Sequence, residues 1–338
     1  MLRSRKGLGI IFILLGLTII LAILALGMGQ YKVPWSSVLL VLKEALFTNV
    51  DGNVSSEQAV VWFVRLPRVI IALLVGAALA MSGAVMQGIL SNPLADPGIV
   101  GISSGASLGA VIAISLGLNT GNMFALPACA FVGSISAVCL TLFLAMRKGK
   151  IPVMTLLLAG VSVGMFLSAV TAGFLTAMNE QQTQQYLFWM VGGLDFRRWE
   201  HVYLALGPIS LGIMLMLLAA KHLNVLVLGE TEARSVGMDV GIWRIGLLGL
   251  ASLTTAASVC VSGNIGFVGL VIPHMLRILV GADHRLLLPA SALGGAFFLL
   301  FCDTLGRTIL QPTEIRVGIM TAVLGTPYFL YLLRKMAK

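Results

Sequence analysis

The sequence predicts an all-α membrane protein with about ten membrane-spanning helices. Of the 338 residues, 58% are hydrophobic and 10% are charged, and the mean hydropathy is +1.01. This composition is too apolar for a soluble protein of this length. Because roughly 20 residues cross about 30 Å of hydrocarbon, the apolar segments provide about ten spans joined by short loops. No segment is left for a soluble domain, so we predict a single transmembrane domain over residues 1–338.

The predicted spans begin close to the N-terminus. Arg3, Arg5 and Lys6 precede the first apolar segment, which is longer than the apolar part of a cleavable signal peptide, so we expect it to be retained as a helix. Residues 30–66 are more polar and form a loop with room for one amphipathic helix. In chain order, the spans lie near residues 8–28, 68–89, 97–116, 122–146, 152–176, 200–220, 242–262, 266–281, 286–306 and 315–333.

The positive charge of the chain fits membrane topology better than nucleic-acid binding. The formal net charge is +9, but the 22 Lys and Arg residues are scattered over short loops and form no long basic face. With both termini in the cytoplasm, most of these residues lie on the cytoplasmic side, as the positive-inside rule requires. We therefore predict contact with the lipid bilayer, both termini inside, and no nucleic-acid partner.

A polar break interrupts the apolar pattern after the second predicted span. Ser91 to Gly109 read SNPLADPGIVGISSGASLG. Pro93 and Pro97 each fix φ, remove a backbone donor and disfavour helix in the preceding residue, so the chain must break between two helices. We expect Asp96 to stabilise the start of the next helix, because a negative charge is favourable at a helix N-terminus.

Small residues recur at helical spacing on both sides of this break. Gly76, Ala80 and Gly83 share one face of the second span. After the break, glycines recur at every fourth position and predict a helix-packing seam, where another backbone can approach closely. These glycines are Gly101, Gly105 and Gly109. Two interpretations of such seams are open. They are either passive packing grooves in a multispan bundle, or they take part in transport.

A second polar segment lies far along the chain. Residues 221–239 read KHLNVLVLGETEARSVGMD and predict a short helix with exposed charges, preceded by Gly229 and followed by Gly237. Two interpretations are open. The segment is either a solvated loop that sets topology, or a helix on the membrane face that receives a push from another protein.

Several ordered motifs resemble one family of transporters. The run NPLADPG followed by GxxxGAxxG resembles the signature of the FecCD-type permeases of iron-siderophore and cobalamin ABC importers. The pattern GExxAxxxG over 229–237 resembles the coupling segment of that family, which extends here over about 222–240. Residues 65–98, 264–289 and 313–335 are also similar to these permeases. The resemblance covers most of the chain beyond residue 60.

The resemblance implies a type II ABC importer permease architecture and a set of partners. These are two cytoplasmic ATPase subunits, a second permease subunit that is the same or a paralogue, and an extracytoplasmic substrate-binding protein. The location it implies is the bacterial plasma membrane, as a multi-pass protein. The chain itself has no phosphate-binding loop, because its one Gly-Lys pair, Gly149-Lys150, is followed by isoleucine. We therefore expect no cofactor on this chain and no enzymatic activity, with ATP and Mg on the partner ATPases.

The resemblance also implies where gating and coupling occur. The loop after the second span narrows the pathway at the cytoplasmic side, and the start of the fifth span forms the other constriction. The predicted gate residues are Asn92, Pro93, Leu94, Pro152 and Val153. The residues predicted to couple to the ATPase are Gly229, Glu230, Glu232, Ala233, Arg234 and Gly237.

Three arginines are predicted at the outer side. The resemblance implies that Arg65, Arg68 and Arg307 meet glutamates of the binding protein, and such pairs orient a partner and speed its encounter. Anchoring at lipid headgroups is the alternative. Asp303 lies one helical turn before Arg307, and we expect these two side chains to pair.

The cargo is predicted to be an Fe(III)-siderophore. EIRVG (314–318) has Arg316 where the cobalamin branch has proline, which favours the siderophore branch, with cobalamin and haem as alternatives. No metal site is predicted, because the four histidines lack the i, i+4 spacing of a helical metal site. They are His201, His222, His274 and His284.

Two other classes of protein compete with this interpretation. An ion-coupled secondary transporter also has broken helices, but it would place acidic residues at mid-membrane, and most of the 13 acidic residues here lie in loops or at span ends. An intramembrane serine protease would use Ser103 or Ser104 with His274, although GISSG does not match GxSG.

Overall fold

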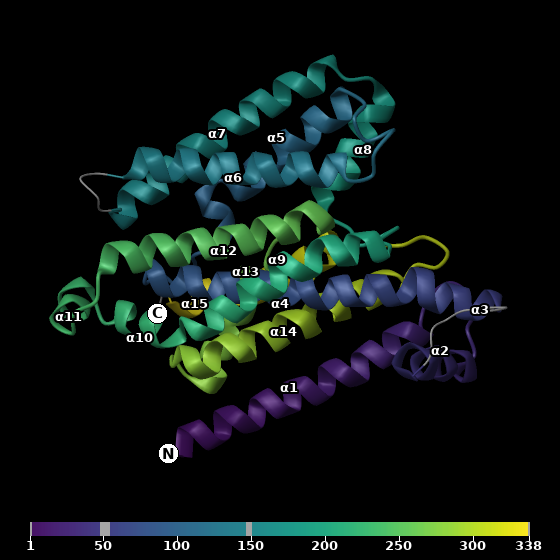
Figure 1. Ribbon diagram of the computed structural model, residues 1–338, viewed down its shortest axis with the longest axis horizontal. Helices are drawn as coiled ribbons and strands as arrows, with labels where there is room; N and C mark the ends of the chain where they lie inside the picture. Colours follow the sequence, from purple (N-terminus) through teal and green to yellow (C-terminus); the bar gives the residue numbers. More distant parts are fainter. Residues whose placement is uncertain (1, 48–54, 147–150, 337–338) are drawn as a thin grey trace.

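The computed structural model describes residues 2–47, 55–146 and 151–336, and every regular element in these ranges is helical (Figure 1). The predicted all-α fold is thereby confirmed. The helices are α1 (Leu2–Gly27), α2 (Trp35–Phe47), α3 (Ser56–Ala59), η1 (Val60–Arg65), α4 (Leu66–Ile89), η2 (Pro97–Val100), α5 (Ile102–Ser115), α6 (Ala125–Ala145), α7 (Val153–Ala177), α8 (Glu180–Val191), α9 (Trp199–Leu218), α10 (Ala220–Val227), α11 (Glu230–Ser235), α12 (Val240–Ser262), α13 (Val268–Val280), α14 (His284–Gly306) and α15 (Val317–Met336).

A helix occupies each segment that the sequence predicts to span the membrane. Seven helices in the described ranges are long and apolar enough to cross a bilayer, including one continuous helix from Ser56 to Ile89. Shorter apolar helices occupy 102–115, 268–280 and 317–331. Because these three are shorter than a usual span, the total of about ten crossings stays a prediction.

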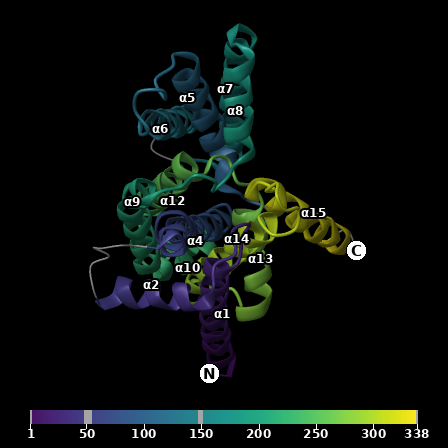
Figure 2. The same ribbon diagram turned by 90° about the vertical axis from the view of Figure 1, so that its right-hand side faces the viewer.

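Helix α4 lies at the centre of the bundle. Figures 1 and 2 show α9, α12, α13 and α14 around it, while α5, α6, α7 and α8 form a separate layer on one side. Of the most apolar window of the α4 segment, 78% is buried, against 11% for α1. Protein therefore surrounds α4, whereas most of the apolar surface of α1 faces away from the bundle.

Close backbone contacts position α4 against its neighbours. A Cβ atom on Gly76 would collide with the carbonyl of Gly295 on α14, and one on Gly83 would collide with the carbonyl of Gly269 on α13. A Cβ on Gly295 would in turn meet Ala80. The small-residue seam predicted on the second span is confirmed, and it brings three helices to backbone contact distance.

Two of the three glycines of the predicted seam on α5 lie against the backbone of α6. Gly105 faces the carbonyl of Gly133 on α6, and Gly109 faces the carbonyl of Cys129 on the same helix. Gly101 differs, because a Cβ there would lie 3.6 Å or more from its nearest neighbours. Its φ of 89° is left-handed, and it caps the start of α5. Gly101 is therefore required by backbone conformation rather than by helix packing.

The break between α4 and α5 has the predicted cap. Asp96 precedes the short helix η2, and its Oδ1 accepts a hydrogen bond from the backbone N–H of Gly98 at 2.8 Å. Asp96 thus satisfies a backbone donor at a helix N-terminus, as expected from its position before Gly98.

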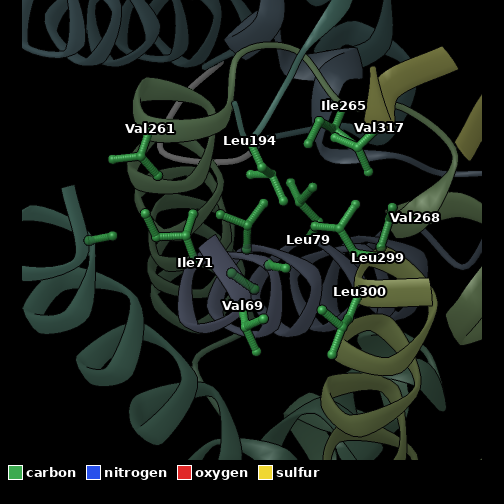
Figure 3. Close-up of a cluster of buried hydrophobic side chains, with 14 of the residues drawn as sticks. Val69, Ile71, Leu79, Leu194, Val261, Ile265, Val268, Leu299, Leu300 and Val317 are labelled. Atoms are coloured by element: carbon green, nitrogen blue, oxygen red, sulfur yellow. The ribbon is translucent and has the colours of Figure 1, made fainter. Parts of the chain in front are cut away.

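A continuous apolar cluster fills the space between α4 and the surrounding helices. Figure 3 shows side chains of α4, α12, α13, α14 and α15 converging on it. Leu194 and Ile265 come from loops rather than helices and are also buried there. The labelled residues of this cluster are Val69, Ile71, Leu79, Leu194, Val261, Ile265, Val268, Leu299, Leu300 and Val317.

The two ends of the molecule differ in what they carry. Figure 1 shows α10 and α11 at the end where α1 begins and α15 ends, and α2, α3 and α8 at the opposite end. We call these the α11 end and the α2 end. The termini therefore lie at the same end as the predicted coupling segment, while the side of the membrane that this end faces stays a prediction.

The contact between α4 and α13 gives a first testable expectation. Gly83→Ala places a methyl group against the backbone of Gly269, so we expect a loss of stability of about 1–3 kcal/mol, measured as a lower midpoint of thermal unfolding in detergent micelles. Gly9→Ala is the matched control, because nothing lies within 4 Å of a Cβ at that exposed helical position. Equal midpoints for the two variants would contradict the assigned backbone contact.

Candidate functional site

The predicted coupling segment contains a short helix bounded by two left-handed glycines. α11 covers Glu230–Ser235. Gly229 precedes it with a φ of 120°, and Gly237 follows it with a φ of 80°. Residues other than glycine rarely adopt such positive φ angles. The sequence prediction of a short helix between these two glycines is confirmed.

One face of α11 is held by the bundle and the other is exposed. Ala233 is fully buried, whereas Glu230, Glu232 and Arg234 are exposed. Arg234 Nη2 lies 2.8 Å from Glu230 Oε1, an exposed i, i+4 pair that contributes only a few tenths of a kcal/mol. These charges stabilise the helix little, so they are available to a partner.

Apolar side chains flank the exposed charges. Leu228 is 68% exposed and Val236 is 70% exposed, one on each side of α11. Arg244 on α12 lies 4.0 Å from Glu230 and donates a hydrogen bond to the carbonyl of Ile151, just before α7. Arg244 thus links α11 to the loop before α7, which is distant in sequence. The surface of α11 also combines apolar and charged groups, as protein interfaces do.

The first predicted gate segment is a tight turn at the α11 end. Asn92 donates its backbone N–H to the carbonyl of Gln87, and its Oδ1 accepts the N–H of Leu94 at 2.9 Å. Asn92 is exposed, and Pro93 and Leu94 are half-buried. The asparagine therefore shapes the turn through its side chain, in the manner of an Asx turn.

The second predicted gate segment begins α7 at the same end. Pro152 is the N-cap residue of α7 and is exposed, and Val153 is half-buried. Val153 packs against the buried cluster that includes Leu90 and Ile151. Leu90 and Ala95, which flank the first segment, belong to the same cluster. The role of both segments as a gate stays a prediction.

At the α2 end, Arg68 is the centre of an ion-pair network. Its Nε lies 3.0 Å from both carboxylate oxygens of Asp303 on α14, and its Nη2 lies 2.8 Å from Asp303 Oδ1. Nη1 donates to Glu314 at 2.9 Å, and Asp195 lies 3.6 Å away. Arg68 therefore ties α4 to α14 and to two loops of the α2 end.

The other two predicted arginines satisfy the carbonyls at the end of α1. Arg65 donates from Nη1 to the carbonyls of Leu26 and Gly27 at 2.7 and 2.9 Å, and Arg307 donates to the carbonyl of Ala25 at 2.7 Å. Arg307 also lies 3.6 Å from Asp303, which confirms the predicted pair. Positive charge is favourable at a helix C-terminus, where carbonyls lack partners in the helix.

These positions bear on the predicted docking of a binding protein. Arg65, Arg68 and Arg307 are 4%, 8% and 3% exposed, and each has internal partners. A direct contact would require the release of those partners, so the internal network accounts for the three charges at this end. Headgroup anchoring meets the same objection, because it too requires exposed guanidinium groups. The docking role of these three side chains stays an untested prediction.

A pocket of the α2 end contains residues that the sequence analysis did not single out. Its volume is about 470 Å³, and its lining includes Arg68, Asp195, Arg197, Arg198 and Glu314. Phe196 on its rim is 89% exposed and has a φ of 56°, which is uncommon for a residue other than glycine. The run DFRR between two helices was the available signal, since charged and aromatic residues in a short loop are typical of a binding surface.

Arg316 belongs to this end as well. It donates to the carbonyl of Phe188 at 2.9 Å, stacks over the Phe188 ring at 4.5 Å, and lies 3.3 Å from Asp195. Arg316 thereby connects the start of α15 to α8 and to the loop before α9. A proline at this position would remove all three contacts.

Groups associated with other chemistries do not come together in the described part of the chain. No three His, Cys, Asp or Glu side chains there form a group that could hold a metal ion. Ser103 donates to Asn264 Oδ1 at 3.0 Å rather than to a histidine.

The comparison with protein families decides the class. The FecCD transport family model matches residues 17–335, nearly the whole chain. The chain belongs to the FecCD transport family. Its members include the permease subunits of ABC importers, and the resemblance stated for the sequence motifs is confirmed at this level.

Named relatives of this FecCD permease import different cargoes. It is 43% identical to the cobalamin import system permease protein BtuC of Halobacterium salinarum, over 89% of this chain and 79% of the relative. It is 40% identical to the hemin transport system permease protein HmuU of Yersinia pestis, over 94% and 93% of the two chains. These names do not specifically support the siderophore branch.

A solved structure shares the fold. It is described as an inward-facing conformation of a metal-chelate type ABC transporter, and it is 32% identical with a TM-score of 0.85 over 97% of this chain and 99% of the other. This chain is accordingly an ABC importer permease, a subunit that is not itself an enzyme. Such a permease implies ATPase subunits, a substrate-binding protein and a second permease as partners.

The Arg68 network gives a second testable expectation. Asp303→Asn removes a fully buried carboxylate, which leaves Arg307 without its carboxylate partner and Arg68 with only the less buried Asp195 and Glu314. We therefore expect a loss of about 3–5 kcal/mol of stability, measured by thermal unfolding in detergent micelles. Glu314→Gln is the matched control, since Glu314 pairs with the same guanidinium but is partly exposed, and should cost less than about 1 kcal/mol. Similar losses for both variants would contradict a central role for Asp303.

Proposed function

We propose that this permease moves an organic metal chelate across the bacterial plasma membrane by alternating access, driven by two ATPase subunits at its α11 end. The observation that carries the proposal is the neighbourhood of α11. An exposed coupling helix, held by the buried Ala233, lies at the same end as both predicted gate segments. In this arrangement the α11 end is cytoplasmic, with both termini inside, and the α2 end faces outward.

The proposed cargo is an Fe(III)-siderophore, with cobalamin and haem as the alternatives. Arg316 supports the siderophore branch, because the cobalamin branch has proline there and Arg316 makes contacts that proline cannot make. The names of the relatives support the alternatives. In each case an organic ligand encloses the metal, so the permease would recognise the ligand.

We propose that the substrate-binding protein docks on the pocket of the α2 end. Arg68, held by Asp303 and Glu314, forms part of its lining, and Phe196 and Arg198 are exposed beside it. The proposal keeps the outer location predicted for docking, but transfers the direct contact from the buried arginines to their exposed neighbours. ATP and Mg bind the partner ATPases in this scheme, and this chain binds no cofactor.

Cargo uptake tests the class of substrate. The permease, co-expressed with its ATPase and binding-protein partners, is reconstituted in proteoliposomes and supplied with radio-iron ferrichrome, radio-iron hemin or radio-cobalt cyanocobalamin. We expect ATP-dependent uptake of ferrichrome at least about tenfold above that of the other two, equivalent to a difference of about 1.4 kcal/mol. Preferential uptake of hemin or cyanocobalamin would assign the corresponding alternative. Gradient-driven uptake without the ATPase would favour a secondary transporter.

The exposed apolar residues beside α11 test the ATPase contact. Val236→Asp places a charge in the proposed interface, so we expect at least about a tenfold weaker association with the ATPase, because burial of an unpaired charge costs more than 1.4 kcal/mol, with the thermal unfolding midpoint unchanged. The measurement is co-purification at several ATPase concentrations. Phe196→Asp is the control, since Phe196 is also highly exposed but lies at the opposite end. Retained association in the Val236 variant would exclude this surface.

A further inference from the structure

A polar cluster joins α10 to the start of α14. It consists of Asn224 on α10, Asp283 at the N-cap of α14, and His284 at the first position of α14. Asn224 Nδ2 donates to Asp283 Oδ1 at 2.7 Å. Asn224 Oδ1 accepts the backbone N–H of His284 at 2.8 Å and lies 2.7 Å from His284 Nδ1. We call these three residues the α10–α14 clip.

The hydrogen bonds of the clip determine the state of its members. Because an amide oxygen can only accept, the 2.7 Å contact requires the imidazole proton on Nδ1 of His284. Burial alone would raise the pKa of Asp283, but hydrogen bonds from the Arg285 backbone and from Asn224 lower it below its ordinary value. The clip therefore combines an ionised carboxylate, an amide and an imidazole that donates from Nδ1 in a single arrangement.

The other edge of the imidazole lies against the last turn of α4. His284 is fully buried, and a Cβ on Gly88 would lie 3.0 Å from His284 Nε2 and 3.0 Å from Leu223 Cδ1. Leu223, the residue before Asn224, is also fully buried. Helix α10 thus contacts the end of α4 directly through Leu223 and indirectly through the clip.

The same turn of α4 carries the predicted gate loop. The N–H of Ser91 donates to the carbonyl of Gly88 at 3.3 Å, and the N–H of Asn92 donates to the carbonyl of Gln87 at 3.2 Å. On the other side, α10 leads directly into α11, with the N–H of Gly229 bonded to the carbonyl of Leu226. An unbroken series of contacts therefore runs from α11 through the clip to the start of the loop.

We propose that Asn224 is a positioning residue for transport, which makes α10 and α14 move together. Displacement of α11 then reaches the turn of α4 that carries Asn92, Pro93 and Leu94. The inference rests on the proposed function for the ATPase contact and the gate. Without Asn224, α10 keeps its apolar contacts but loses its polar link to α14. ATP hydrolysis then continues while the gate loop responds less.

A cargo-independent experiment tests this role in the assembled transporter. Leu94→Cys is introduced together with Cys129→Ser and Cys139→Ser, because the two remaining cysteines are buried. The rate of maleimide labelling of the introduced thiol is measured in proteoliposomes, with and without ATP and orthovanadate. In the parent we expect the nucleotide to change this rate. Asn224→Ala should reduce that change by about fivefold or more, while ATP hydrolysis per transporter is retained.

Asn119→Ala is the matched control. Asn119 also donates from its side-chain amide, to Gln185 Oε1 at 3.2 Å, but at an exposed position outside the coupling region. This variant should keep the full nucleotide response. Gly88→Ala provides an independent perturbation of the same contact, because its methyl group presses on both His284 and Leu223. If both residues act on one route, the double variant should lose no more response than the stronger single variant.

The possible outcomes are distinct. A full labelling response in Asn224→Ala overturns the proposal, as does a loss of ATP hydrolysis in proportion to the loss of response, which would indicate general damage. If the parent shows no nucleotide response at Leu94, the proposed gate is wrong. In that case the number of ATP molecules hydrolysed per imported cargo molecule tests the role of Asn224. A higher number in Asn224→Ala than in the parent supports the role, and an unchanged number overturns it.

Discussion

Close packing of α4 against glycine backbones is the constraint on which the rest of the structure depends. The hydrophobic effect contributes little to helix association inside a membrane, because lipid is as apolar as leucine. Van der Waals packing at close backbone contacts must therefore stabilise the bundle. Gly76 and Gly83 on α4 allow α14 and α13 to approach at two levels of the bundle. The same helix therefore positions functional groups at both of its ends.

At the α2 end, this packing allows a dense group of charges to be buried. Arg68 comes from the first turn of α4, and Asp303 comes from the last turn of α14, so the backbone contact between these helices brings the two side chains together. Arg65 and Arg307 then direct their guanidinium groups at the free carbonyls of α1. Breaking one buried ion pair leaves the other charge uncompensated, so the loops that carry Asp195 and Glu314 belong to the same network as α4 and α14.

The α11 end is built differently from the α2 end, because short helices rather than buried ion pairs connect its parts. Short elements, α10 and α11, lie on the end of the bundle. They are held by the buried Leu223, Leu226 and Ala233, by the His222 ring stacked on Trp243 of α12, and by the α10–α14 clip. Loops and short helices of this kind are the segments that move in conformational switching. The membrane permease thus combines an α2 end held by buried ion pairs with an α11 end joined by a few specific contacts.

Local signals predicted most of the elements because their causes are local. Apolar runs, proline positions and the glycines at 229 and 237 act within a few residues, and a helix lies in each segment where those signals predict one. Helix α8 lies between two predicted spans and was not predicted. The family resemblance rested on ordered motifs, and the match over residues 17–335 confirms it. The role of Gly101 was predicted incorrectly, because periodicity alone does not distinguish a packing glycine from one that adopts a positive φ.

The sequence by itself determined the membrane class, the helix positions, the exposed charges of α11 and the family. Only the tertiary structure decided which charged side chains are buried and which residues they pair with. Arg68 and Asp303 are separated by more than two hundred residues, as the sequence separation of their hydrogen bond shows, and no local pattern predicts such a pair. Asn224 and His284 meet for the same reason, since helix rotation and the approach of distant helices depend on packing that a single sequence does not display.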